Sequence, residues 1–231
     1  MFFIFKDKPF VAIIGDIKES KKIENRNEVQ KKLRQVLTEI NEKYDNDIYS
    51  RFIITLGDEF QGLLCNGANT MNIISEIERK MYPVKIRFGV GAGAITTDVS
   101  REMSIGADGP AYYKARNALE TLKDNEKKKQ KNASAIGFEA DGHNRHNNGT
   151  EIMINTILSL LTAIKDSWSD RQREIIWDMQ EHNDSQVDTA GRLKIKQPAV
   201  QKSLSKGKYY AYKDALDTVG KALSEIGEQD V

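Results

Sequence analysis

The order of expected elements predicts an α+β protein, in which a ferredoxin-like domain of β-α-β-β-α-β order is followed by an all-α domain. Three observations lead to this prediction. A continuous apolar run over 10–15 is typical of a strand buried on both faces. Apolar, β-branched segments over 51–56 and 61–65 flank a glycine-containing bend, which indicates a hairpin. From residue 150 onward, apolar residues recur only at helical spacing.

Apolar periodicity justifies the elements of the first domain in turn. After the first strand we expect a helix over 29–44, the hairpin of 51–56 and 61–65, a helix over 71–81, a strand over 84–93, a helix over 111–122 and a strand over 134–139. The second helix ends before Pro83, as the residue before a proline disfavours helix. The lysine-rich stretch 123–132 is expected to be a solvated helix end or loop. The domains are placed at 1–141 and 150–231.

Composition limits the class of protein. The 231 residues carry a net charge of +1, and 39% of them are apolar, which suits a globular chain with a core. A single cysteine, Cys65, leaves no internal disulfide and favours a reducing cytoplasm, where this thiol is expected to serve packing. No segment reaches the roughly 18 apolar residues of a membrane span, so no membrane partner is expected. His143 and His146 lie in a glycine-asparagine loop without the further ligands that a zinc site needs.

Three carboxylates sit where the expected strands meet. Asp16 ends the first strand, and Asp58 and Glu59 occupy the bend of the hairpin that should pair beside it. Carboxylates brought together repel one another unless a proton or a cation intervenes, and oxygen ligands suit Mg²⁺. The alternative is that Asp58 and Glu59 are solvated turn residues while Asp16 caps the next helix. Spacing alone leaves both interpretations open.

Four ordered segments resemble the nucleotide cyclase superfamily. LGDEF at 56–60 is similar to the GGDEF signature of diguanylate cyclases, and GDI at 15–17 resembles the first metal motif of that family. RFGVGAG at 87–93 resembles a strand shared with class III nucleotide cyclases, and ADGPAYYKAR at 107–116 resembles the start of the helix that bears a phosphate-binding basic residue. The resemblance implies a palm-like first domain. The whole chain, with its helical C-terminal segment, resembles the SatD family.

The resemblance also implies roles for individual residues. Asp16 and Asp58 would hold one or two Mg²⁺ (or Mn²⁺) ions, with the Ile17 carbonyl as an extra ligand. Glu59 would be a second metal ligand or a catalytic base. Lys21 and Arg116 would contact triphosphate oxygens, while Asn25 and Tyr112 would lie against the bound nucleotide. The related families use asparagine at two positions where this chain has Glu24 and Tyr112. The first asparagine selects the base and the second acts in turnover, so the resemblance is weakest for these two properties.

The second domain is expected to contain a helix-turn-helix with its core at 167–206. A helix over 167–177 opens with a capping serine; a short helix over 186–193, a turn and a third helix from Gln197 follow. Lys194 stands in the turn where glycine is usual. The third helix would present a set of side chains to DNA: Gln197, Gln201, Lys202 and Lys206. The alternative is a helical bundle for protein interaction.

Two further helices complete the second domain. The helix over 152–164 is apolar around much of its surface, which indicates a buried connector or the seam of a homodimer. Apolar residues over 216–226 predict a terminal amphipathic helix. The predicted function is therefore a nucleotide-responsive regulator that binds a nucleoside triphosphate and DNA. The alternatives are an enzyme that makes a cyclic or linear nucleotide from ATP or GTP, and a scaffold of two interaction domains.

Overall fold

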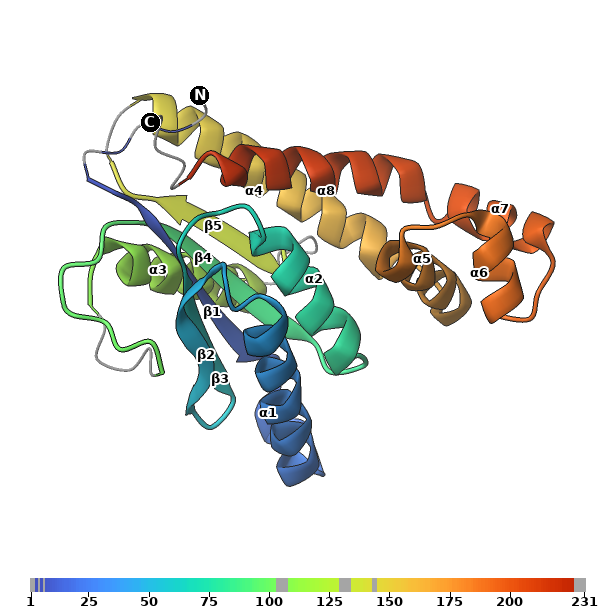
Figure 1. The fold of residues 1–231 in the computed structure, drawn as a ribbon, viewed down its shortest axis with the longest axis horizontal. Coiled ribbons are helices and arrows are strands. Elements are labelled where there is room, and N and C mark those ends of the chain that lie inside the picture. Colours follow the sequence, from blue (N-terminus) through green and yellow to red (C-terminus); the bar gives the residue numbers. More distant parts are fainter. Residues whose placement is uncertain are drawn as a thin grey trace.

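A computed structural model describes residues 3, 5, 7–102, 108–128, 134–142 and 145–226 (Figure 1). The first part contains β1 (Phe10–Ile17), the short 3-10 helix η1 (Ser20–Lys22), α1 (Arg26–Lys43), β2 (Ile48–Leu56), β3 (Glu59–Leu64), α2 (Thr70–Met81), β4 (Ile86–Gly93), α3 (Pro110–Lys127) and β5 (Ile136–Ala140). The second part contains α4 (Arg145–Asp166), α5 (Asp170–His182), α6 (Gln186–Arg192), α7 (Gln197–Lys206) and α8 (Tyr209–Ser224). Every strand and helix expected from the apolar pattern is present.

The five strands form one mixed sheet in the order β2-β3-β1-β4-β5. Each neighbouring pair among β2, β3, β1 and β4 is antiparallel, with β3 between β1 and β2 as in the ferredoxin-like arrangement. β5 then adds parallel to β4 at the edge of the sheet. This arrangement confirms the α+β prediction and puts β1, which carries Asp16, at the centre of the sheet.

Helices cover the two faces of the sheet differently. α1 and α2 pack on one face against the inward side chains of β1, which include Val11 and Ile13. α3 packs on the other face, where a separate apolar cluster includes Ala12 and Ile14. The approach of α3 to β4 is so close that a Cβ on Gly91 would lie 2.1 Å from the Ala111 carbonyl oxygen. The glycine-rich strand is therefore explained by helix packing.

The helical second part shares its core with the first. One cluster of buried apolar residues runs from β1 and α2 through α4 to α5, α7 and α8. α4 and α8 lie side by side and lead away from the sheet to α5, α6 and α7 (Figure 1). A buried ion pair, Lys165 Nζ to Glu78 Oε2 at 2.5 Å, joins the end of α4 to α2. No helix in the described ranges is long and apolar enough to cross a membrane.

One local prediction is corrected and one is made more specific. The first residues of the lysine-rich stretch form the end of α3, which continues through Lys123 to Lys127, and Lys123 makes an ion pair with Asp16 at 3.0 Å. The capping serine of α5 is Ser169, whose hydroxyl accepts a hydrogen bond from the Gln172 amide, two residues after the start of the predicted helix. His143 lies outside the described residues, as does the side chain of His146.

Candidate functional site

Three charged residues line up across the centre of the sheet. In the register of the antiparallel pairs, Asp16 of β1 faces Glu59 of β3 on one side and Arg87 of β4 on the other. Asp16 alternates with Ile17 and shares the parity of Ala12 and Ile14, so this row belongs to the face that α3 covers. Strand pairing thus brings together residues that are far apart in the sequence.

Helix α3 supplies the partners of this row. Arg116 binds both carboxylate oxygens of Glu59, at 2.5 and 2.7 Å, and Lys123 lies 3.0 Å from Asp16 Oδ1. Arg87 donates to Asp16 Oδ2 at 2.5 Å and to Glu126 at 2.6 and 2.9 Å. Lys18 also binds Glu126. We call these seven side chains the ionic row: Glu59, Asp16 and Arg87 of the sheet, Arg116, Lys123 and Glu126 of α3, and Lys18.

Burial and ion pairing shift the pKa values of Arg87 and Glu126 in opposite directions. Asp16 is only 8% exposed. Burial acts to lower the pKa of Arg87, but its bonds to Glu126 and Asp16 outweigh burial and raise that pKa. Burial acts to raise the pKa of Glu126, and the bonds from Arg87 and Lys18 reverse this and lower it. The bond to Glu59 raises the pKa of Arg116. Arg87, Arg116 and Glu126 are therefore charged at neutral pH.

A basic cleft opens beside the ionic row. It has a volume of about 570 Å³ and lies between the β1–α1 loop and the start of β4. Its lining includes Lys18, Lys22, Lys85 and Arg87, together with the carboxylates of Glu19 and Glu126. Arg87 is shared by the cleft and by the ion pair to Asp16. An anion that entered the cleft would thus compete with Asp16 for the same guanidinium group.

Asp58 lies at the bend of the hairpin, next to the end of β1. Its carbonyl oxygen accepts a hydrogen bond from the Ile17 amide at 3.1 Å, and Gly57 takes the positive φ of 60° that the bend requires. Asp58 and Ile17 line a small pocket with Arg26 and other residues of α1 and the preceding loop. The backbone thus joins the two acid-bearing segments, as expected from the hairpin.

The other predicted nucleotide contacts are placed differently. Lys21 is exposed in η1, and Asn25 is exposed at the start of α1. Tyr112 is buried between α3 and the sheet in the cluster with Ala12 and Ile14. It lies four residues, about one helical turn, before Arg116 on the same helix. Of the predicted cofactor contacts, only Arg116 belongs to the ionic row.

The donor atoms suit a hard cation, but they are engaged. Asp16, Asp58 and Glu59 offer the carboxylate oxygens that Mg²⁺ prefers. In the ionic row, however, both oxygens of Asp16 and both of Glu59 bind arginine or lysine. Among the described residues, no cluster of three or more His, Cys, Asp or Glu side chains forms a ready metal site. A metal would fit these residues only after their ion pairs open.

Sequence reasoning did not identify Arg87, Lys123, Glu126 or Lys18. Helical spacing held part of the signal, because Lys123 and Glu126 follow Arg116 by seven and ten residues and so lie on one side of α3. Arg87 required the strand register, since only pairing with β1 shows that it stands opposite Asp16. The pairing of acids with bases could not be read from a single strand or helix.

The second region of interest is the three-helix unit α5, α6 and α7. α6 and α7 are joined by the short turn at Leu193–Lys196, in which Lys194 has a positive φ of 52°. Ala190 of α6 is buried. All four predicted DNA contacts are exposed on α7: Gln197, Gln201, Lys202 and Lys206. The two glutamines are bridged by Gln186 of α6, at 2.7 and 2.5 Å.

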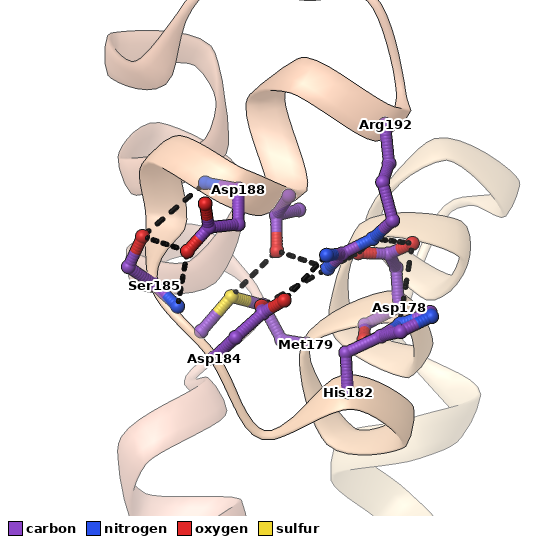
Figure 2. Close-up of polar contacts among 8 residues, drawn as sticks. Asp178, Met179, His182, Asp184, Ser185, Asp188 and Arg192 are labelled. Carbon is purple, nitrogen blue, oxygen red and sulfur yellow. Dashed lines mark hydrogen bonds and ion pairs between the residues drawn. The ribbon is translucent and has the colours of Figure 1, made fainter.

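The connection between α5 and α6 is held by one arginine. Figure 2 shows Arg192 of α6 between Asp178 of α5 and Asp184 of the connection; its Nη2 lies 2.6 Å from Asp178 Oδ1. The hydrogen bonds that Arg192 donates to Asp184 and Asp178 raise its pKa. Ser185 and Asp188 form a capping box at the start of α6. Arg192 thus fixes α6 on α5 and is not available as a surface cation.

Fold and site together define an α+β protein whose five-stranded sheet carries a buried acid-base row beside a basic cleft. The sequence assigns that protein to a family, because the SatD family model matches residues 10–215. The chain therefore belongs to the SatD family, as its motifs indicated. No curated protein matches it.

Solved structures with similarity to the chain include nucleotide cyclases. A bacterial light-regulated adenylyl cyclase is 17% identical, covers 57% of this chain and 75% of its own, and has a TM-score of 0.42. The guanylate cyclase domain from Catenaria anguillulae in complex with GTP is 16% identical, with coverage of 49% and 73% and a TM-score of 0.39. A regulator of polyketide synthase expression from Bifidobacterium adolescentis is 11% identical, with coverage of 93% and 86% and a TM-score of 0.27.

Proposed function

We propose that the sheet end of this protein binds a nucleoside triphosphate with Mg²⁺ or Mn²⁺, and that the helical end binds DNA. The observation that carries the first half is the register that sets Glu59, Asp16 and Arg87 in one row beside a lysine-lined cleft. Fixed cations at the cleft suit phosphate oxygens, and the carboxylates suit a hard cation. Arg116, Arg87, Lys18 and Lys123 would contact phosphate, and Asp16 and Asp58 would hold the metal.

In this proposal the site binds the nucleotide and does not convert it into a product. Glu59, the residue that the resemblance assigns as a base, accepts hydrogen bonds from Arg116 at both oxygens, so it can take a proton only after Arg116 has moved to the phosphate. Tyr112, which stands where class III cyclases use an asparagine, is buried between α3 and the sheet beside Ala12 and Ile14. Synthesis of a cyclic or linear nucleotide remains the alternative, and pyrophosphate release from ATP or GTP would establish it.

Thermal denaturation tests nucleotide binding. ATP or GTP at 100 times its dissociation constant adds about 2.7 kcal/mol of stability, which raises the Tm of a chain this size by about 5–10 °C. With Mg²⁺ present we expect such a rise for one of the two, and a smaller one for Asp58→Asn. The matched control is Asp98→Asn, an exposed aspartate of the β4–α3 connection. No rise with either nucleotide, or equal rises in both variants, would count against the proposal.

The positive charge around α7 supports the proposal that the helical end binds DNA. Residues 189–213 contain seven lysines and arginines and no aspartate or glutamate. Arg192 and Lys213 are engaged by carboxylates, which leaves five exposed lysines around α6–α7 and the start of α8: Lys194, Lys196, Lys202, Lys206 and Lys208. A basic surface around an exposed helix suits the DNA phosphate backbone, while Gln197 and Gln201 could read bases once released from Gln186.

Electrophoretic mobility with genomic fragments, with and without Mg²⁺ and triphosphates, tests this half. Lys202→Met should weaken binding to all sequences and flatten the salt dependence, whereas Gln201→Ala should relax preference at particular bases. Lys221→Met, an exposed lysine of α8, is the matched control and should bind as wild type. If no fragment binds above the non-specific level at physiological salt, the DNA-binding half is wrong.

A further inference from the structure

The ionic row is internally neutralised. It contains four cations and three carboxylates, a net charge of +1, and every carboxylate in it is bound by at least one cation. Asp16 is held from two sides, by Arg87 of β4 and Lys123 of α3. The side chain of Arg87 is itself only 13% exposed and is shared between Asp16 and Glu126. A ligand therefore enters a site in which each charge already has a partner.

Neither a metal nor a triphosphate fits this charge distribution by itself. A divalent cation alone would have to displace Arg87 or Lys123 from Asp16, and it would bring the local charge to about +3 in a partly buried place. A triphosphate carries about four negative charges at neutral pH, so alone it would leave about −3 and would strip Asp16 of its partners. The two ligands together leave about −1. Electrostatics thus favours joint binding over either single event.

We propose that metal and triphosphate bind this protein by exchanging the ion pairs of the ionic row. Phosphate oxygens take over Arg87 and Lys123, and the metal takes the oxygens of Asp16 that those side chains leave. Arg87 is the positioning residue of the exchange, since it borders the cleft and holds Asp16 at the same time. The inference rests on the proposed nucleotide site and adds that metal and nucleotide each raise the affinity for the other by the same factor.

Isothermal titration of the full chain measures this coupling. ATP and GTP are titrated with EDTA and again with MgCl₂, and MgCl₂ is titrated without nucleotide. We expect nucleotide affinity to rise at least tenfold with Mg²⁺, and Mg²⁺ alone to bind weakly. Arg87→Met frees one oxygen of Asp16 in the absence of nucleotide. It should therefore bind Mg²⁺ alone at least tenfold more tightly than wild type and show a smaller coupling.

Arg101→Met is the matched control, because Arg101 is an exposed arginine paired with Asp45 outside the ionic row. It should keep the coupling of wild type. Nucleotide that binds wild type equally with EDTA and with Mg²⁺ would overturn the exchange while leaving the nucleotide site intact. Absence of nucleotide binding under every condition would reject the nucleotide site and the exchange together. Lys123→Met, which frees the other oxygen of Asp16, makes the same comparison if Arg87→Met does not fold.

Discussion

At the scale of single residues, the backbone strain of Lys194 and the ion pairs of Asp16 are only partly indicated by the sequence. Lys194 departs from the glycine that usually occupies the turn of a helix-turn-helix, and its φ of 52° shows why glycine is usual there. Asp16 was identified as a candidate ligand from its place at a strand end. Its partners Arg87 and Lys123 were not, because they come from a different strand and a different helix.

Lys194→Gly should stabilise the protein. A residue with a Cβ in the left-handed region costs about 1 kcal/mol relative to glycine, and this strain disappears in the variant. Urea denaturation should show a rise of about that size in the free energy of unfolding. Lys194→Ala is the control, because it removes the charge and keeps the Cβ. Equal behaviour of the two variants would show that charge, not backbone strain, governs this position.

At the scale of elements, apolar periodicity predicted every strand and helix, but it could not show how the sheet edges are closed. The outer edge of β2 is bound by Asn41 of α1, which accepts from the Phe52 amide at 2.8 Å and donates to its carbonyl at 2.9 Å. Asn155 of α4 makes the same pair of bonds to Phe138 of β5, at 2.9 and 2.7 Å. These side chains replace a neighbouring strand and protect both edges from pairing with another chain.

Asn155→Leu should therefore destabilise the fold. Leucine has a similar size but leaves the amide and carbonyl of Phe138 without these partners, which costs about 1–3 kcal/mol. Chemical denaturation measures the loss, and Asn41→Leu should behave alike at the other edge. Asn148→Leu, an exposed asparagine of the same helix, should change stability by less than about 0.5 kcal/mol. A loss from Asn148→Leu as large as that from Asn155→Leu would refute this account.

At the scale of the whole molecule, the two predicted domains share one core. Arg173 of α5 lies over the ring of Tyr82, which follows α2, and over those of Trp168 and Trp177, while Trp168 Nε1 donates to the Gly207 carbonyl at 2.7 Å. These contacts connect the end of α2 with α5 and with the end of α7. The sequence predicted both parts but not this junction, since it depends on side chains from separate elements.

One exposed surface on α4 fits the predicted homodimer. Ile152 and Leu160 are 67% and 60% exposed, and Met153 lies beside them. We expect these residues to pair two subunits, because exposed apolar side chains on one helix face are typical of such contacts. Leu160→Glu should then shift light scattering from dimer to monomer, whereas Lys221→Glu on α8 should not. A wild-type monomer at all concentrations would refute the pairing.

The central claim is that metal and nucleotide meet at the ionic row, and paramagnetic broadening by Mn²⁺ locates them directly. Amide signals of the full chain are recorded with ATP or GTP and Mn²⁺, with Mn²⁺ alone, and with Mg²⁺ as the diamagnetic reference. The account predicts that Mn²⁺ with nucleotide broadens the signals of Ile17, Lys18, Asp58 and Glu59, and that Mn²⁺ alone has little effect there. Broadening centred elsewhere, such as around Lys165 and Trp177, or no localised broadening at all, would contradict it.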